Sequence, residues 1–198
     1  FGTGSAGAGL PGAPTLQGLP GSASSGNIQD LIKYYASYSG IDPSVFTAMI
    51  RQESSFNPNE KGPVIKKGPL TGDRAYGLGQ VMGTTGAGYG ASIDDLMDPS
   101  TNLRISAEHL TKQIQFIQTD FGKLDDTIKF ALAAYNAGYG HVKGGLRTLQ
   151  SQGQPLTWEN LSALGNKGLP QPGETIPYVN AIMQGIGTGG ISGGRMAS

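Results

Sequence analysis

The sequence predicts a mainly α-helical domain, and three observations support this fold class. Apolar residues recur at every third or fourth position through the middle of the chain, which is the spacing of one helix face. Residues typical of helix starts and helix ends bound these segments. The chain has 198 residues, enough for one domain with a sizeable core. We therefore expect one globular unit with little β structure.

The first two predicted helices follow each other closely. Residues 28–39 carry an apolar stripe, and Gly40 is placed to end this helix. Asp42 and Pro43 then form a typical start, because aspartate accepts hydrogen bonds from the first N–H groups and proline suits the first helical position. The second helix is expected to end near Ser55.

Later segments repeat the same pattern of apolar stripes between capping residues. The helices expected there run from Asp98 or Pro99 to Phe121, from Asp125 or Asp126 to Gly138 or Gly140, over 158–164 and over 176–186. The first of them is the longest in the chain.

A long loop rich in proline, glycine and lysine, residues 57–75, follows the second helix. Loops of this length are often functional. Its apolar residues between Val64 and Leu70 are the candidate for a small hairpin, although Pro63 and Pro69 flank it. We expect any β structure to lie in the loop after the second helix, taken through to Gln80.

Glycine is the compositional outlier, at 33 of 198 residues. Residues 1–27 consist mainly of Gly, Ala, Ser and Pro, and residues 187–198 are again rich in glycine. Such compositions are typical of linkers and tails, so the folded domain is predicted over 28–186. Because the chain starts with Phe1 rather than methionine, we expect a processed product or a piece of a longer polypeptide.

Charge and residue usage exclude several classes of function. Lysine plus arginine and aspartate plus glutamate number 14 each, which does not fit a nucleic-acid binder. There is no cysteine and no apolar run long enough to span a membrane. His109 and His141 are not spaced as a metal motif, and the aspartates at 94, 95 and 98 lack EF-hand spacing. We expect no metal, no cofactor and no membrane insertion, and a solvated turn with a helix cap at the aspartates.

One acidic residue occupies a core position of the second helix. Phe46, Met49 and Ile50 form its apolar stripe, and Glu53 is the next position on that stripe. Burial disfavours a charged carboxylate and raises its pKa, which suits a general acid near neutral pH. The alternative is a salt-bridged glutamate at a helix end.

Three further sequence islands accompany Glu53: Ala75-Tyr76-Gly77-Leu78-Gly79-Gln80, Ala134-Tyr135-Asn136-Ala137-Gly138 and Glu174-Thr175-Ile176-Pro177-Tyr178-Val179. In this order and at these separations, residues 28–186 resemble the catalytic domain of soluble lytic transglycosylases, lysozyme-like enzymes that cut bacterial peptidoglycan. The resemblance implies a lysozyme-like helical fold with a groove between the Glu53 helix, the loop 57–80 and the helix ending near Gly138.

The resemblance also implies a mechanism with one carboxyl group. Glu53 would protonate the oxygen linking N-acetylmuramic acid to N-acetylglucosamine, and would then deprotonate the C6 hydroxyl that attacks the anomeric carbon. The product would carry a 1,6-anhydro sugar, and no water would be consumed. One group acting as acid and then as base suits a raised pKa.

The remaining site residues implied by the resemblance would contact the glycan or the catalytic carboxyl: Ser54, Tyr76, Gln80, Tyr135, Asn136 and Tyr178. The tyrosine hydroxyl of the last would lie close to Glu53. Alternatives are a backbone hydrogen bond for Ser54, packing for Tyr76, Tyr135 and Tyr178, and helix capping for Asn136. Gly79 stands where the family usually carries methionine, so we expect a lost apolar wall and a wider cleft there.

Two other functions compete with this one. Residues 72–78 are also similar to goose-type lysozymes, for which Asp73 would be the candidate base in hydrolysis of the same bond. Met82, however, occupies a place where that family tends to carry aspartate. The second alternative is an inactive glycan-binding or structural module, because a fold alone does not prove activity.

The flanking segments suggest the biological setting. Glycine-rich flanks and the absence of a visible export signal indicate a part of a larger phage tail or secretion assembly. We expect a virion-associated protein that acts on peptidoglycan glycan strands at the bacterial cell wall. A periplasmic or secreted bacterial enzyme is the alternative.

Overall fold

The structure, a computed structural model, describes residues 25–188. The elements in that range are α1 (Ser25–Tyr38), α2 (Pro43–Ser54), β1 (Ala75–Tyr76), β2 (Val81–Met82), α3 (Gly83–Gly88), α4 (Ile93–Leu96), α5 (Pro99–Phe121), α6 (Thr127–Ala137), α7 (Tyr139–Ser151), α8 (Trp158–Ala163), the 3₁₀ helix η1 (Gly165–Lys167) and α9 (Pro172–Thr188). The predicted mainly α-helical fold class is therefore confirmed.

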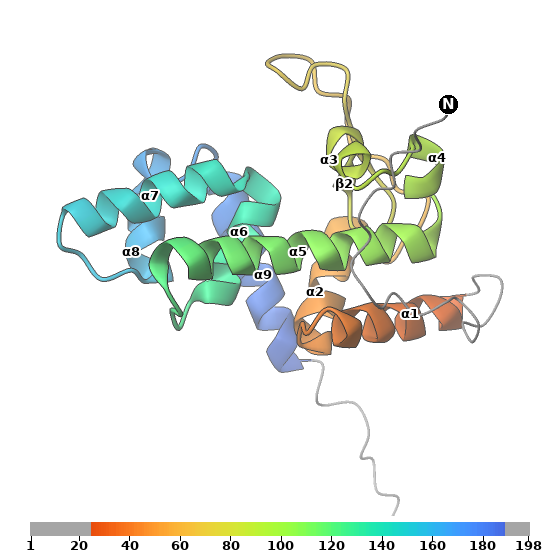
Figure 1. The fold of residues 1–198 in the computed structure, drawn as a ribbon, viewed down its shortest axis with the longest axis horizontal. Coiled ribbons are helices and arrows are strands. Elements are labelled where there is room, and N and C mark those ends of the chain that lie inside the picture. Colours follow the sequence, from red (N-terminus) through yellow and green to blue (C-terminus); the bar gives the residue numbers. More distant parts are fainter. Residues whose placement is uncertain (1–24, 189–198) are drawn as a thin grey trace, which may run out of the picture.

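The long helix α5 is the axis of the fold. It runs through the middle of Figure 1 and packs against α1, α4, α6 and α7. Its predicted start is confirmed, because the side chain of Asp98 accepts a hydrogen bond from the Thr101 N–H and Pro99 takes the first helical position. One end of α5 carries α3 and α4, and the other lies beside α7. A single rigid helix therefore sets the spacing between the two halves of the molecule.

Helix α2 begins and ends as its sequence predicts. Asp42 accepts from the Ser44 N–H, and Ser55 closes the helix in the left-handed region with a φ of 52°. The helix packs between α1 and α9. Its stripe residues Phe46, Met49 and Ile50 are fully buried.

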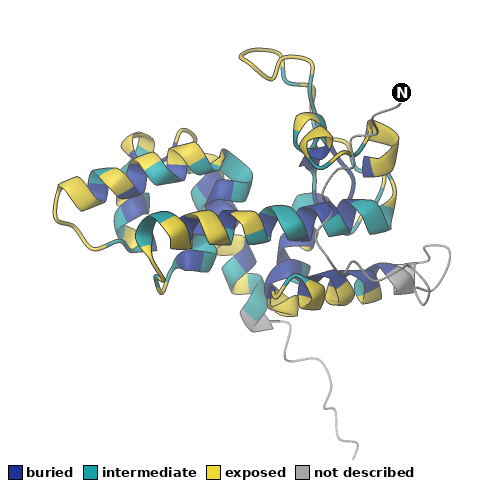
Figure 2. Cartoon of the chain, viewed as in Figure 1, coloured by how far each residue is buried: buried dark blue, intermediate teal, exposed yellow. Residues whose placement is uncertain are grey.

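The core is formed mainly by the inner faces of these helices, as the burial pattern in Figure 2 shows. A smaller cluster under the sheet contains Tyr76, Val81, Leu96 and Ile105. It fixes α4 and the short strands to one end of α5.

The β structure lies at the end of the loop 57–80 and directly after it, not at the candidate hairpin. The sheet pairs β1 with β2 in antiparallel register, Ala75 opposite Met82, whereas the expected hairpin between Val64 and Leu70 forms no strands. That segment is held by hydrogen bonds from the Ile65 N–H to the Asp73 carbonyl and from the Gly72 N–H to the Ile65 carbonyl, both 2.8 Å long. Pro63 and Pro69 lack the N–H groups that a ladder needs.

The helix predicted to end at Gly138 or Gly140 is followed at once by α7, which the sequence analysis did not predict. Gly138 turns the chain with a φ of 89°, and α7 begins at the next residue. Its buried positions Val142, Leu146 and Leu149 have helical spacing, so the signal was present. It was masked because α7 contains glycine at positions 140, 144 and 145, and glycine disfavours helices.

Two short helices after the sheet were also not predicted, since α3 and α4 are only 6 and 4 residues long. The aspartates beside them act as caps, as expected. Asp95 forms a capping box with Ser92 in α4, and Asp98 caps α5.

The ends of the domain differ slightly from their predicted positions. Helix α1 begins at Ser25 rather than Ile28, and α9 spans Pro172–Thr188 rather than 176–186, with Pro177 inside it. Apart from these helix ends, the predicted linker 1–27 and tail 187–198 lie outside the described residues. Among residues 25–188, no helix combines the length and apolar character needed to cross a membrane.

Gly145 offers a test of how tightly α7 is packed. A Cβ at this position would lie 2.5 Å from Leu161 Cδ1 and 2.6 Å from the Gly168 carbonyl oxygen. Gly145→Ala is expected to lower the free energy of unfolding by about 1–3 kcal/mol through overpacking. Gly144→Ala is the matched control, because a Cβ there meets no atom within 4 Å. It should leave stability unchanged or raise it by up to about 1 kcal/mol. Urea denaturation measures both; equal effects would contradict the packing.

Candidate active site

Glu53 lies in the last turn of α2, on the stripe that packs into the core. Its side chain is partly buried, and its Oε1 accepts a 2.6 Å hydrogen bond from the hydroxyl of Tyr178 on α9. Tyr178 itself is buried. The two residues are far apart in the chain and meet because α9 packs directly against α2.

The surroundings of Glu53 keep its carboxyl group near the midpoint of titration at neutral pH. Burial raises the pKa of Glu53 to about 7, the hydrogen bond from Tyr178 opposes this rise, and the negative charge of Glu174 adds to it. Desolvation disfavours the carboxylate, whereas the phenol stabilises it. Glu53 can therefore both release and accept a proton near pH 7.

The strip Gly77–Gln80 connects β1 and β2 beside Glu53, and a buried amide holds it in place. Asn102 on α5 accepts from the Gly79 N–H at 2.8 Å and donates to the Tyr76 and Leu96 carbonyls, each also at 2.8 Å. Gly77 has a φ of 70°, and a Cβ there would lie 2.5 Å from Asn102 Nδ2. Only glycine fits such an approach. The sequence analysis missed Asn102, whose one signal was a polar residue beside the apolar stripe of α5.

Ser54 joins the strip to the catalytic helix. Its buried hydroxyl donates to the Leu78 carbonyl at 2.7 Å. This is the backbone contact considered as its alternative role. In this geometry Ser54 acts on the strip, and its predicted contact with the saccharide stays a prediction.

Gly79 does not leave an opening in the cleft in the way its sequence suggested. A Cβ at this position would point into α5, 1.9 Å from Ser106 Oγ and 2.7 Å from Ser106 Cβ. Both Gly79 and Ser106 are buried. The space toward which a side chain at 79 would project is therefore filled by α5, and the expectation of a wider cleft is corrected.

Tyr135 of α6 reaches the same strip from the other side. Its hydroxyl donates to the Gly79 carbonyl at 2.7 Å. Burial, together with the nearby charge of Glu53, raises the pKa of Tyr135 and keeps the phenol protonated. Glu53, the strip and Tyr135 thus lie together at the meeting of α2, the sheet and α6.

His109 lies behind Tyr135 in an aromatic row. Its ring centroid is 5.2 Å from that of Tyr135 and 6.0 Å from that of Tyr89. Its two ring nitrogens lie 3.2 Å from the Tyr89 hydroxyl and from the amide nitrogen of Gln113. Burial lowers the pKa of His109 to about 4, with a further contribution from Lys112, so the ring is neutral at pH 7. The sequence argued against a metal role for His109, and its place in this aromatic row was not predicted.

Asn136 lines a cavity beside Glu174 and Thr175 of α9. The Thr175 hydroxyl donates to its Oδ1 at 2.8 Å, so Asn136 is oriented by α9 rather than serving only as a helix cap. The cavity, about 230 Å³ in volume, is lined by Asn136, Ala137, His141, Pro170, Gln171, Glu174 and Thr175. Glu174 is exposed there and was missed as a site residue, although it opens the fourth sequence island.

Two residues predicted to bind substrate make contacts within the protein. Tyr76 is buried in the small cluster under the sheet, which matches its packing alternative. Gln80 is partly exposed, and its Nε2 donates to the Gly77 carbonyl at 2.9 Å. Its backbone has a φ of 45°, a strained conformation for a residue with a side chain. Such strain is often found at functional sites.

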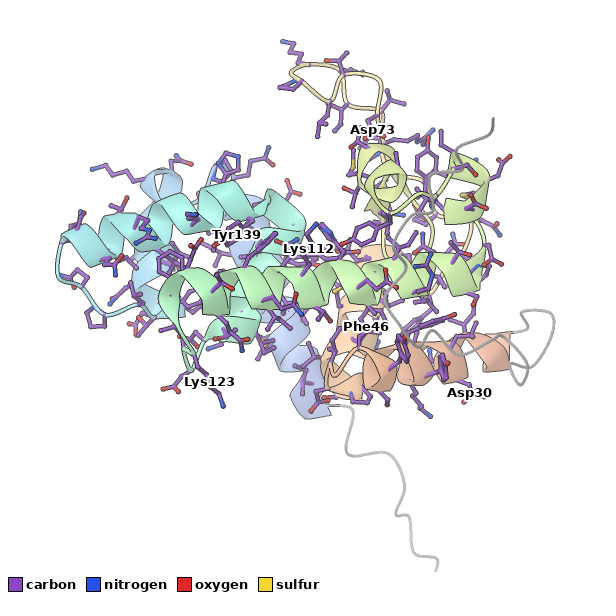
Figure 3. All side chains as sticks on the ribbon, in the orientation of Figure 1. Asp30, Phe46, Asp73, Lys112, Lys123 and Tyr139 are labelled. Carbon is purple, nitrogen blue, oxygen red and sulfur yellow. The ribbon has the colours of Figure 1, made fainter. Side chains whose placement is uncertain are left out.

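Asp73, the candidate second carboxylate, accepts hydrogen bonds from the start of α3. Its two oxygens accept hydrogen bonds from the N–H groups of Arg74, Gly83 and Thr84 and from the Thr84 hydroxyl. These bonds outweigh desolvation and lower the pKa of Asp73. Asp73 lies at the foot of the projecting loop in Figure 3. Between residues 25 and 188, no three His, Asp or Glu side chains gather as metal ligands would.

This arrangement defines a class of protein. It is a helical domain in which a partly buried carboxyl group accepts a hydrogen bond from a tyrosine, beside a glycine strip whose backbone is held by side-chain hydrogen bonds. The family described as the transglycosylase SLT domain matches residues 30–157. The chain belongs to this family. The matched region ends before α8 and α9, so the fold brings Glu174 and Tyr178 to the site from outside it.

Known proteins show the same relationship. The chain is similar to the membrane-bound lytic murein transglycosylase F of Vibrio cholerae, with 32% identity over 65% of this chain and 22% of the relative. It is similar to the soluble lytic murein transglycosylase of Escherichia coli K12, with 37% identity over 58% of this chain and 16% of the relative.

A solved structure of the lytic transglycosylase Slt of Pseudomonas aeruginosa, an inactive Glu-to-Gln mutant, matches with a TM-score of 0.58 and 25% identity. The match covers 80% of this chain and 23% of that one. The 70 kDa soluble lytic transglycosylase of Escherichia coli matches with a TM-score of 0.55 and 27% identity, over 79% of this chain and 23% of that one. The chain thus spans about a quarter or less of the proteins that it matches.

The proton affinity of Glu53 can be tested by titration. In a carboxyl-detected NMR titration, wild-type Glu53 is expected to titrate near its pKa of about 7. Tyr178→Phe should raise that pKa, because the phenol stabilises the carboxylate, and Glu174→Gln should lower it by removing a like charge. Tyr135→Phe is the control, since its hydroxyl bonds to the Gly79 carbonyl instead. A Tyr178→Phe pKa equal to or below the wild-type value would refute this account.

The contact between Gly79 and Ser106 gives a second test. Gly79→Ala is expected to lower the free energy of unfolding by about 1–3 kcal/mol, because α5 cannot move away. Ser106→Gly alone should cost about 1 kcal/mol as a helix glycine. The double variant Gly79→Ala, Ser106→Gly should lose less free energy of unfolding than the two single losses added together. Simple additivity in urea denaturation would show that the two positions do not clash.

Proposed function

We propose that this chain is a peptidoglycan lytic transglycosylase. It would cleave the β-1,4 bond between N-acetylmuramic acid and N-acetylglucosamine and leave a 1,6-anhydro end. One observation carries the proposal: the partly buried carboxyl group of Glu53 is hydrogen-bonded to Tyr178 and has a pKa of about 7. Membership of the SLT domain family and the names of its relatives support it.

In the proposed reaction, Glu53 acts twice. As a carboxylic acid it gives its proton to the glycosidic oxygen while the bond from the anomeric carbon breaks. As a carboxylate it then accepts the proton of the muramic C6 hydroxyl, whose oxygen forms the new bond to the anomeric carbon. The proton count balances, and Glu53 ends protonated. Tyr178 would hold the carboxylate in place between the two steps.

The state of Asp73 supports this route over hydrolysis. A hydrolase with Asp73 as base needs a carboxylate free to hold a water. Both oxygens of Asp73 already accept hydrogen bonds at the start of α3, and the pKa of Asp73 is lowered. An inactive glycan-binding module is also less well supported, because such a module has no use for a carboxyl group that titrates near pH 7.

The setting we propose is local opening of the bacterial cell wall. The relatives are named as murein transglycosylases, one membrane-bound and one soluble. We further propose that the chain works within a phage tail or a secretion assembly, which its glycine-rich flanks support. A periplasmic bacterial enzyme is the alternative setting. Mass spectrometry of purified virions would test the phage setting, and absence of the polypeptide from virions would refute that setting.

Replacement of the catalytic carboxyl is the direct test of the reaction. Glu53→Gln is expected to lower muropeptide release from purified sacculi by at least about 10²-fold, because the amide cannot transfer a proton as the acid does. Mass spectrometry of the wild-type products should detect 1,6-anhydromuramic ends. Reducing ends in their place would reassign the chain to the hydrolases.

Asp73→Asn is the matched control for this experiment. It should cost about 1 kcal/mol of stability by weakening the start of α3, and it should leave the anhydro product unchanged. Loss of activity in a folded Asp73→Asn protein would support the hydrolytic alternative.

A further inference from the structure

A cationic arm, residues 61–72, stands out from the body of the molecule. In Figure 1 it is the yellow loop that projects beyond α3, and the sticks in Figure 3 show its side chains turned away from the helices. Its tip makes no regular secondary structure. Val64 is 46% exposed and Leu70 is 42% exposed, so the arm presents apolar side chains as well as charge to solvent.

The base of the arm is attached to the strip that borders Glu53. Lys61 forms an isolated bridge with Tyr76, and the Gly62 N–H donates to the Ala75 carbonyl at 3.0 Å. Arg74 Nε donates to the Gly62 carbonyl at 2.9 Å. A Cβ on Gly62 would lie 3.2 Å from Gln80 Oε1. The arm therefore starts beside a predicted substrate-binding residue and leads away from it.

The charge of the arm is of one sign. Lys61, Lys66 and Lys67 lie within it, and residues 61–72 contain no aspartate or glutamate. All three lysines are exposed, and the ion pairs of the described residues involve other cations. The chain as a whole has no net charge, so this concentration is local. The acidic groups next to the arm form hydrogen bonds elsewhere. Asp73 accepts a hydrogen bond at the start of α3, and Glu60 accepts one from the side chain of Asn57.

We propose that the cationic arm binds the carboxylates of the peptide stems on peptidoglycan. This rests on the proposed function, because a glycan strand held at Glu53 would present its stems beside the strand. At about 3.3 Å per residue, a fully extended segment from Gly62 to Lys67 would reach roughly 15 Å from its base, so its lysines would contact groups beside the glycan strand. Lys66 and Lys67 would meet carboxylates there, and Val64 and Leu70 would cover the small apolar side chains of the stem.

Other anionic partners fit the arm less well. Nucleic acid needs a wider basic surface than three lysines provide. Stable membrane attachment needs a larger apolar area or more cations than one short loop carries. The stems require neither, because several weak contacts to a polymer add up through multivalency.

The experiment uses the whole chain carrying Glu53→Gln, so that binding is measured without turnover. Co-sedimentation is measured with intact sacculi and with glycan strands from which an amidase has removed the stems. Lys66→Gln with Lys67→Gln is expected to weaken binding to sacculi about three- to ten-fold and to reduce its salt dependence. The Lys66→Arg, Lys67→Arg pair should retain binding.

The control is Lys33→Gln with Lys123→Gln, which removes the same charge from exposed positions away from the arm; Figure 3 labels Lys123 on the opposite side of the molecule. This pair should bind sacculi as the parent protein does. An equal loss in the control, or an equal loss on stripped strands, would overturn the proposal. So would a loss confined to phosphatidylglycerol vesicles, which would assign the arm to the membrane.

The same variants, with Glu53 restored, separate this proposal from the proposed function. If the arm binds the peptide stems, the double variant Lys66→Gln, Lys67→Gln should have a higher ratio of KM on sacculi to KM on stripped strands. The control pair should keep the wild-type ratio. If the wild-type chain releases no product from either substrate, the proposed function fails, and the sedimentation result still decides the role of the arm.

Discussion

The site depends on one constraint, the burial of the Glu53 carboxyl group at the end of an apolar helix face. Burial alone would keep the group neutral, and an unpaired carboxyl in a core would be costly. Tyr178 supplies a single hydrogen bond, and Glu174 supplies a nearby like charge. The balance places the pKa of Glu53 at about 7. The packing of α2 against α9 therefore sets this pKa as well as adding stability, since that contact brings the phenol to the acid.

The second organising feature is a strip of backbone held by buried polar side chains. Asn102, Ser54 and Tyr135 each form hydrogen bonds with main-chain atoms between residues 76 and 79. Each comes from a different helix, so the strip is held in place from several sides. A strip held in this way can keep Gln80 in a strained conformation, because the surrounding bonds stabilise it. Glycines at 77 and 79 allow α5 to approach closely enough for those bonds to form.

Family membership and site geometry support the same function by independent routes. The family match covers residues 30–157, whereas Tyr178 and Glu174 come from α9, beyond it. The geometry of Asp73 also removes the residue on which the hydrolytic alternative depended, because its oxygens are used by α3. The cationic arm adds a feature that neither the family match nor the catalytic geometry requires. Its charge is placed where a stem-bearing substrate would extend from the site.

The sequence by itself determined the helical class, the bounds of α2 and α5, and the position of Glu53 on a buried stripe. These are local properties: apolar spacing, proline at a first turn and aspartate at a cap act within a few residues. Tertiary structure alone decided the rest. It placed the strands at 75–82, filled the space beside Gly79 with Ser106 and used Asp73 to hold the start of α3. Each of these outcomes depends on contacts between segments that are distant in the chain, and residue spacing carries no information about such contacts.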